Sequence, residues 1–83
     1  MNYITEDKPE VVIAKIIFNC NKNKIDYIIE KTSDLTKIYV EYFTIRFMRY
    51  NNVTDMIISA FPETQEKNIE TYFNILHKIL NNI

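Results

Sequence analysis

The sequence predicts a small, mainly α-helical domain, because three stretches of apolar residues recur at helical spacing, within 11–20, 35–53 and 69–83. The longest is the middle stretch, in which the spacing i, i+3, i+4, i+7, i+8, i+11 is occupied by Tyr39, Tyr42, Phe43, Arg46, Phe47 and Tyr50. Read as one strand, this stretch shows no polar face and exceeds the usual strand length. We therefore expect a helix that begins near Leu35 and ends at Asn51 and Asn52, since Asn accepts the left-handed conformation.

Composition narrows the class of protein. With 83 residues, of which 47% are hydrophobic and 25% charged, the chain is expected to form one globular domain, residues 1–83. The net charge of −1 gives no overall basic field, so any binding of DNA has to depend on a local patch. The first residues lack a signal-peptide pattern and no apolar run reaches the length of a membrane span, which favours a cytoplasmic protein without membrane contact. Glycine is absent, so turns must use Asn, Asp, Ser or Pro.

The first half of the chain is expected to carry two shorter helices. Asp7 and Pro9 fit a helix start, and the apolar stripe of residues 11–20 follows, although a strand over 11–18 is the competing interpretation. A polar loop then leads to a short helix at 25–32, and Ser33 and Asp34 are expected to cap the long central helix. Residues 1–6 are expected to be a loosely docked end.

The second half is expected to end in an amphipathic helix. Residues 53–61 fit either a short hairpin or a short helix capped by Thr54. Thr64 to Asn82 is the clearest helical pattern of the chain. The rest of the chain is too small to cover the apolar stripe of this helix. We therefore expect antiparallel pairing in a homodimer through Ile69, Tyr72, Phe73, Leu76, Ile79 and Leu80.

This order of elements resembles small winged helix-turn-helix proteins of archaea and viruses that carry a C-terminal dimerisation helix. The resemblance is carried by Asp34-Leu35-Thr36, by Val40, Thr44, Phe47 and Met48 at the spacing of a recognition helix, by Asn51-Asn52-Val53 and by Thr64-Gln-Glu-Lys-Asn68. It implies a winged-helix body at 7–61 and a dimerisation helix at 62–83; an all-α four-helix bundle is the alternative. The function that it implies is that of a dimeric transcriptional regulator that binds double-stranded DNA.

The DNA-contacting residues expected on this basis lie around the central helix. Cations suit phosphate contacts and an exposed tyrosine suits contact with bases, which selects Lys31, Thr36, Lys37, Tyr42, Arg46 and Arg49. Lys22 and Lys24 would extend the patch. The plainer interpretation is a solvated edge, with core packing for the aromatic residues.

A second hypothesis is a helical module that binds another protein, such as a phage- or plasmid-encoded inhibitor or adaptor of a host protein. It rests on the near-neutral charge and on an expected apolar surface of Ile38, Tyr42 and Ile45. An enzyme is not expected, since Cys20 and His77 are the only residues of their types and no glycine loop is present to cradle phosphate. For the same reason we expect no metal and no cofactor.

Overall fold

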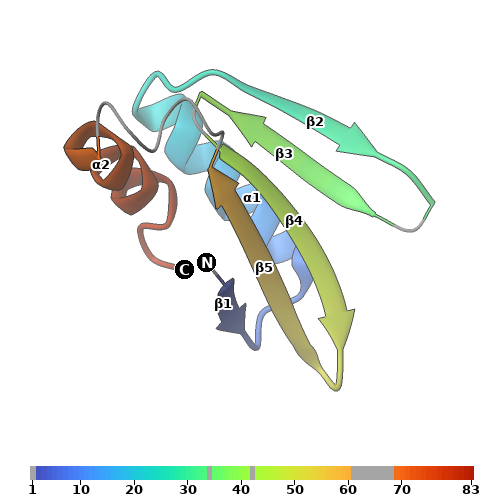
Figure 1. Cartoon of the computed structure of the whole chain (residues 1–83). Helices are drawn as coiled ribbons and strands as arrows, with labels where there is room; N and C mark the ends of the chain where they lie inside the picture. Colours follow the sequence, from blue (N-terminus) through green and yellow to red (C-terminus); the bar gives the residue numbers. More distant parts are fainter. Residues whose placement is uncertain (1, 34, 42, 61–68) are drawn as a thin grey trace.

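A five-stranded antiparallel sheet forms the body of the protein (Figure 1). The computed structural model describes residues 2–33, 35–41, 43–60 and 69–83, without the side chains of Ile69 and Tyr72. The strands lie in the spatial order β1-β5-β4-β3-β2. Their bounds are β1 Asn2–Thr5, β2 Tyr27–Lys31, β3 Thr36–Val40, β4 Phe43–Tyr50 and β5 Val53–Ala60. Two helices, α1 (Pro9–Lys22) and α2 (Ile69–Ile79), complete the described fold.

The predicted mainly α fold is therefore wrong, and so are the winged helix-turn-helix and the four-helix bundle. The expected central helix consists of two strands, β3 and β4. Val40 lies directly opposite Phe43, and both side chains face the core. The two residues between these strands shift the alternation by one position, so the buried residues are even-numbered in β3 and odd-numbered in β4. No single period therefore runs across this connection, although within each strand the side chains alternate between a buried and an open face.

The turn between β4 and β5 explains why the central stretch ends where it does. Asn51 and Asn52 have φ angles of 51° and 64°, and Tyr50 pairs with Val53 across them. Positive φ at both central residues is the requirement of the type I′ turn, the favoured two-residue connection of a hairpin. The left-handed conformation predicted for these asparagines is thus confirmed, but it closes a hairpin and does not end a helix.

Three further elements differ from the expectations. The short helix expected at 25–32 is β2, because an isolated run of five residues with isoleucines at neighbouring positions fits an edge strand as well as one helical turn. Residues 53–60 form the single strand β5, which pairs with β4 along its whole length. Residues 2–5 form β1, which pairs with β5 at the sheet edge.

Helix α1 confirms the helix predicted over 11–20. It begins after Lys8, whose extended backbone is typical of the residue before a proline, and Pro9 takes the first helical position. Asp7 does not cap the helix; its carboxylate forms an ion pair with Lys15, 3.0 Å away. At the other end Lys24 has a φ of 56°, and the amide of Ile25 donates to the carbonyl of Cys20 at 2.8 Å, which is the bond of a Schellman motif.

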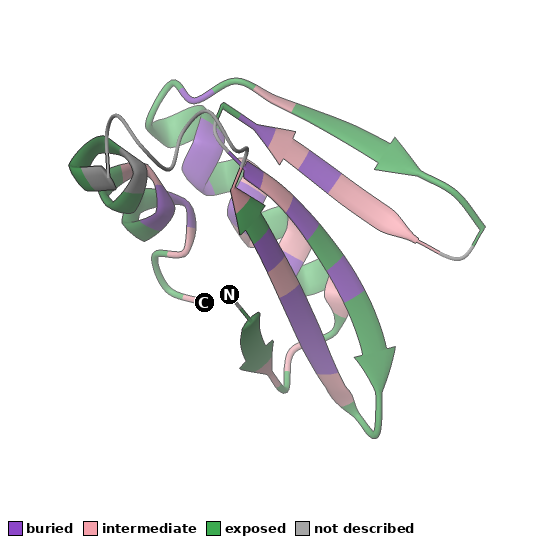
Figure 2. Ribbon diagram, in the orientation of Figure 1, coloured by how far each residue is buried: buried purple, intermediate pink, exposed green. Residues whose placement is uncertain are grey.

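The core lies between α1 and one face of the sheet, and α2 packs beside α1 (Figure 2). It is built from Val12, Ile16, Cys20, Ile25, Ile38, Val40, Phe43, Ile45, Phe47, Met56, Ile58, Leu76 and Ile79. β1 and β2 lie at opposite edges and run in the same direction, because four antiparallel pairings separate them. Helix α1 is the connection that joins them, which is why it crosses the whole sheet and buries its stripe there. The helical prediction for the C-terminal stretch is confirmed at Ile69–Ile79, while its expected start at 64–68 lies outside the described residues.

Candidate interaction surface

One face of the sheet carries no helix among the residues that the structure describes. The registers place alternate residues of all five strands on this face, and we call it the open face. Its large apolar side chains are exposed: Ile28 at 70%, Ile4 at 61%, Tyr50 at 48% and Met48 at 47%. Tyr39, Val53 and Ile57 lie between them and are half-buried. A face with this much apolar surface is typical of a binding site, since monomeric proteins seldom leave such a patch to water.

Charged residues of both signs cross the open face in one row. Glu30 lies opposite Lys37, Lys37 lies opposite Arg46, and Arg46 lies opposite Ile57. A separate carboxylate, Asp55, lies on the neighbouring row between Met48 and Ile4. Two cations and two carboxylates therefore balance each other across these strands, so the open face has no field of one sign.

Asp55 fixes the edge strand to the sheet. Its side chain is 7% exposed, and the side-chain amide of Asn2 donates to both carboxylate oxygens at 3.2 Å. Buried polar groups need such partners, and these bonds hold β1 in register beside β5. Ile4 is thereby kept in place on the open face.

Arg49 lies on the opposite side of the sheet, where it holds the connection between β1 and α1. Its guanidinium donates to the carbonyl of Asp7 at 3.0 Å, to that of Glu6 at 3.4 Å and to the hydroxyl of Thr54 at 3.0 Å. The Thr54 hydroxyl in turn donates to the Asp7 carbonyl at 2.7 Å. Sequence reasoning assigned Arg49 to phosphate contact and missed this structural use.

The residues predicted to contact DNA do not lie together. Lys37 and Arg46 are neighbours on the open face. Lys31, Thr36 and Arg49 line a hollow of about 470 Å³ on the helix side, together with Glu10 at the start of α1. Tyr42 lies outside the described residues, and Lys22 and Lys24 lie at the C-terminal end of α1. The predicted convergence of cations on one surface is therefore absent from the part of the chain that is described.

The residues predicted to form a helical dimer seam divide in a similar way. Leu76 and Ile79 are 4% and 0% exposed and belong to the core of the chain itself. Leu80 packs partly against the same core, and Phe73 is 56% exposed. The side chains of Ile69 and Tyr72 are not described. Half of the residues that were expected to pack between two copies therefore pack against the core of their own chain.

The apolar surface that was expected to bind a protein partner is buried in the described residues. Ile38 and Ile45 are both fully buried, so the prediction that they form an exposed patch with Tyr42 is wrong. They lie opposite each other in β3 and β4 on the face that α1 covers. The exposed apolar residues lie elsewhere: Met48 and Tyr50 further along β4, Ile28 in β2 and Ile4 in β1. The alternation within 43–50 was the signal that would have found the first two.

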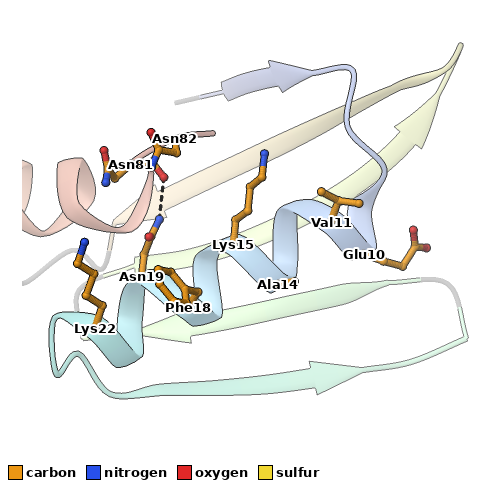
Figure 3. A pocket seen from close by; sticks show the side chains of 9 residues that line it. All are labelled: Glu10, Val11, Ala14, Lys15, Phe18, Asn19, Lys22, Asn81 and Asn82. Atoms are coloured by element: carbon orange, nitrogen blue, oxygen red, sulfur yellow. Dashed lines mark hydrogen bonds between the residues drawn. The ribbon is translucent and has the colours of Figure 1, made fainter.

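A second apolar surface follows the outward side of α1 (Figure 3). A hollow of about 610 Å³ lies between this helix and the C-terminal residues, and its apolar lining comes from Val11, Ala14 and Phe18. Phe18 is 65% exposed and Val11 is 43% exposed. At one end Asn19 donates from its side-chain amide to the carbonyl of Asn81, at 2.9 Å. This groove is the alternative docking position on the molecule.

Reactive side chains do not gather at either surface. Cys20 is fully buried, and burial raises the pKa of its thiol to about 11, so the thiol stays protonated and unreactive near neutral pH. In the described part of the chain, no three His, Cys, Asp or Glu side chains are close enough to hold a metal ion. Neither helix within the described ranges has the length and apolar character needed to cross a membrane.

Comparison of the chain with models of protein families, with curated proteins and with solved structures finds no match.

Proposed function

We propose that the chain is a non-enzymatic protein-interaction module that binds a partner protein through the open face of its sheet. The observation that supports this most is the exposure of Ile4, Ile28, Met48 and Tyr50 on a face without a helix in the described residues. Aromatic and methionine side chains are enriched at protein interfaces, where the core of the patch is apolar and its rim is polar. The open face has this composition.

The balance of charge favours a protein over a nucleic acid as the ligand. Binding to phosphate backbones requires several clustered cations, whereas Lys37 and Arg46 share this face with Glu30 and Asp55. A protein partner tolerates such mixed charges, because pairs across an interface fix its register. Binding of double-stranded DNA stays an untested prediction, and its expected recognition helix is replaced by strands β3 and β4.

Affinity capture with matched variants tests this proposal. Met48→Lys combined with Tyr50→Glu places two charges on the open face, at positions whose side chains are half-exposed, and the new ammonium at position 48 lies opposite the carboxylate of Asp55. The control is Phe18→Glu, which places a carboxylate in the groove of α1, at a side chain that is 65% exposed. We expect the double variant to lose a captured partner at least about 30-fold, as for loss of interface hot spots, and the control to retain it.

Two results would contradict the proposal. The first is loss of the partner from the Phe18→Glu chain with retention by the double variant, which would place binding in the groove of α1. The second is salt-sensitive binding of a mixed-sequence DNA duplex, measured by fluorescence anisotropy, that weakens when Lys37→Ala and Arg46→Ala are combined. Removal of two phosphate contacts would lower the salt slope by about two.

A further inference from the structure

Among the residues that the structure describes, no strand pairs with the outer edge of β2. β2 pairs with β3 on its other side and forms one edge of the sheet. Its side chains at Ile28 and Ile29 are 70% and 41% exposed, an unusual exposure for consecutive isoleucines. The other edge strand, β1, has only four residues, and the hydroxyl of Tyr3 donates to the carbonyl of Ile83 at 2.7 Å. A longer apolar edge is a template for another strand.

The backbone groups available at this edge follow from the hairpin between β2 and β3. The amide of Thr32 donates to the carbonyl of Leu35 at 2.8 Å, which makes these two residues a hydrogen-bonded pair. In an antiparallel ladder such pairs alternate with pairs that exchange no bonds. Thus the amides and carbonyls of Glu30 and Ile28 point toward β3. Those of Tyr27, Ile29 and Lys31 point outward, away from the sheet.

We propose that a second copy of this chain pairs with β2, antiparallel, about a twofold axis that passes through Ile29. In this register Ile29 faces Ile29 of the second copy, and Tyr27 faces Lys31. These are the three residues whose backbone groups point outward, so all three bond across the axis in each copy. The two sheets become one continuous sheet of ten strands.

The charges of β2 select this register over its neighbours. Moving the axis to Ile28 places Asp26 directly opposite Glu30, and moving it to Glu30 places two Glu30 side chains face to face. Like charges at directly opposite positions destabilise a strand pair. With the axis at Ile29, Glu30 faces Ile28 and Asp26 faces Thr32, so no like charges meet. Axes at Tyr27 or Lys31 would keep the same backbone groups outward. The first places Ile29 opposite Ile25, whose amide already donates to the carbonyl of Cys20, and the second places two Lys31 side chains face to face. The axis at Ile29 is therefore the register that fits both the backbone and the charges.

The helix side of the same edge fits a second copy as well. A hollow of about 310 Å³ lies between α1 and β2, and its lining includes Ile13, Ile17 and Ile29. A second β2 strand would continue the sheet below this hollow and bring the second Ile29 against the first. The apolar strip beside α1 is then covered by the same pairing that satisfies the edge. This inference goes beyond the proposed function and does not depend on it, because Ile4, Met48 and Tyr50 lie on strands away from the paired edge.

Charged residues introduced at Ile29, on the proposed axis, test the inference. Ile29→Lys and Ile29→Glu each place two like charges opposite each other and remove the apolar contact, and each variant should raise the dimer Kd about tenfold or more. An equimolar mixture of the two variants should restore the dimer, since an ammonium then faces a carboxylate. The measurement is sedimentation velocity over a concentration series, in which the native chain approaches twice its mass of 10.0 kDa.

Two further variants test which residues face each other and which edge strand pairs. Ile28→Lys places an ammonium opposite Glu30 of the second copy, and it should lower the dimer Kd about two- to fivefold. This variant decides the question if the Ile29 chains fail to fold by circular dichroism. The control is Ile4→Lys on the opposite edge strand, which should leave the dimer Kd unchanged. A native chain that stays at the mass of one copy, or a dimer that Ile29→Lys leaves intact, would overturn the inference.

Discussion

Replacement of Asn19 by leucine should destabilise the protein, because this buried side chain joins the two helices. Its amide nitrogen donates to the carbonyl of Ile79 at 3.0 Å and to that of Asn81 at 2.9 Å. Both acceptors lie at the C-terminal end of α2, where a helix has no partners of its own for its last carbonyls. Asn19 is 4% exposed, and leucine has a similar shape, so Asn19→Leu removes two hydrogen bonds and creates little cavity.

The expected loss of stability follows from the number of hydrogen bonds that are removed. Each intramolecular hydrogen bond contributes about 0.5–1.5 kcal/mol, so removal of two lowers the free energy of unfolding by about 1–3 kcal/mol. For a domain of this size each kcal/mol corresponds to a Tm change of about 4–8 °C, which makes the effect clear in a thermal melt. The control is Asn21→Leu, an exposed position of the same helix that gains the same helix propensity. Equal Tm values for the two variants would mean that the two hydrogen bonds of Asn19 do not stabilise the fold, since water would then replace the amide at both carbonyls.

Three other predictions address the turns, the buried thiol and the arginine. Lys24 has a φ of 56°, so Lys24→Gly should raise the free energy of unfolding by about 0.5–1 kcal/mol in urea titrations, whereas a decrease would show that the lysine side chain stabilises the helix end. Burial raises the pKa of the Cys20 thiol from 9.0 to about 11. The folded state therefore favours the neutral thiol, and about 2–3 kcal/mol of stability that is complete below pH ~9 is lost as the pH rises to ~11. Cys20→Ala should flatten this alkaline slope, and an unchanged slope would contradict the assignment. Arg49→Ala should cost about 1–2 kcal/mol by chemical denaturation through its bonds to Asp7 and Thr54, and a neutral result would contradict a structural role for this guanidinium.

The helices were predictable from sequence because their signals are local. Pro9 fixes the start of α1 and the stripe of Val12, Ile16 and Cys20 fixes its buried face. The left-handed conformation of Asn51 and Asn52 was predictable for the same reason. Each of these features depends on a few consecutive residues and needs no knowledge of the rest of the fold.

The sheet was not predictable in the same way, because its pairing is non-local. The spacing of Tyr39, Phe43 and Phe47 matches a helical period, yet Phe43 and Phe47 lie on the buried face of β4 and Tyr39 lies on the open face of β3. The match arises from two strands whose alternation is offset by the connection between them. Only a division of the stretch at residues 41–42 reveals that each strand alternates between a buried and an open face.

The candidate surface was missed as a consequence of this error. An interpretation as one helix placed Ile38 and Ile45 outside, whereas a hairpin buries both and exposes Met48 and Tyr50. The phosphate contact predicted for Arg49 rests on its positive charge and on the other cations near it in the sequence. Its true partners, the carbonyls of Glu6 and Asp7, lie more than 40 residues away in the chain and carry no sequence signal.

Site-specific photo-cross-linking can detect a protein partner that lies on the open face. The photoreactive residue benzoylphenylalanine would replace Tyr50 or Met48 on the open face, or Phe18 on the outward side of α1, in cells that encode the protein. We expect a discrete adduct of higher mass from Tyr50 and Met48, which remains when Ile29→Lys is added to remove adducts between copies, and none from Phe18. An adduct from Phe18 alone, or none from the open face, would contradict the proposed function.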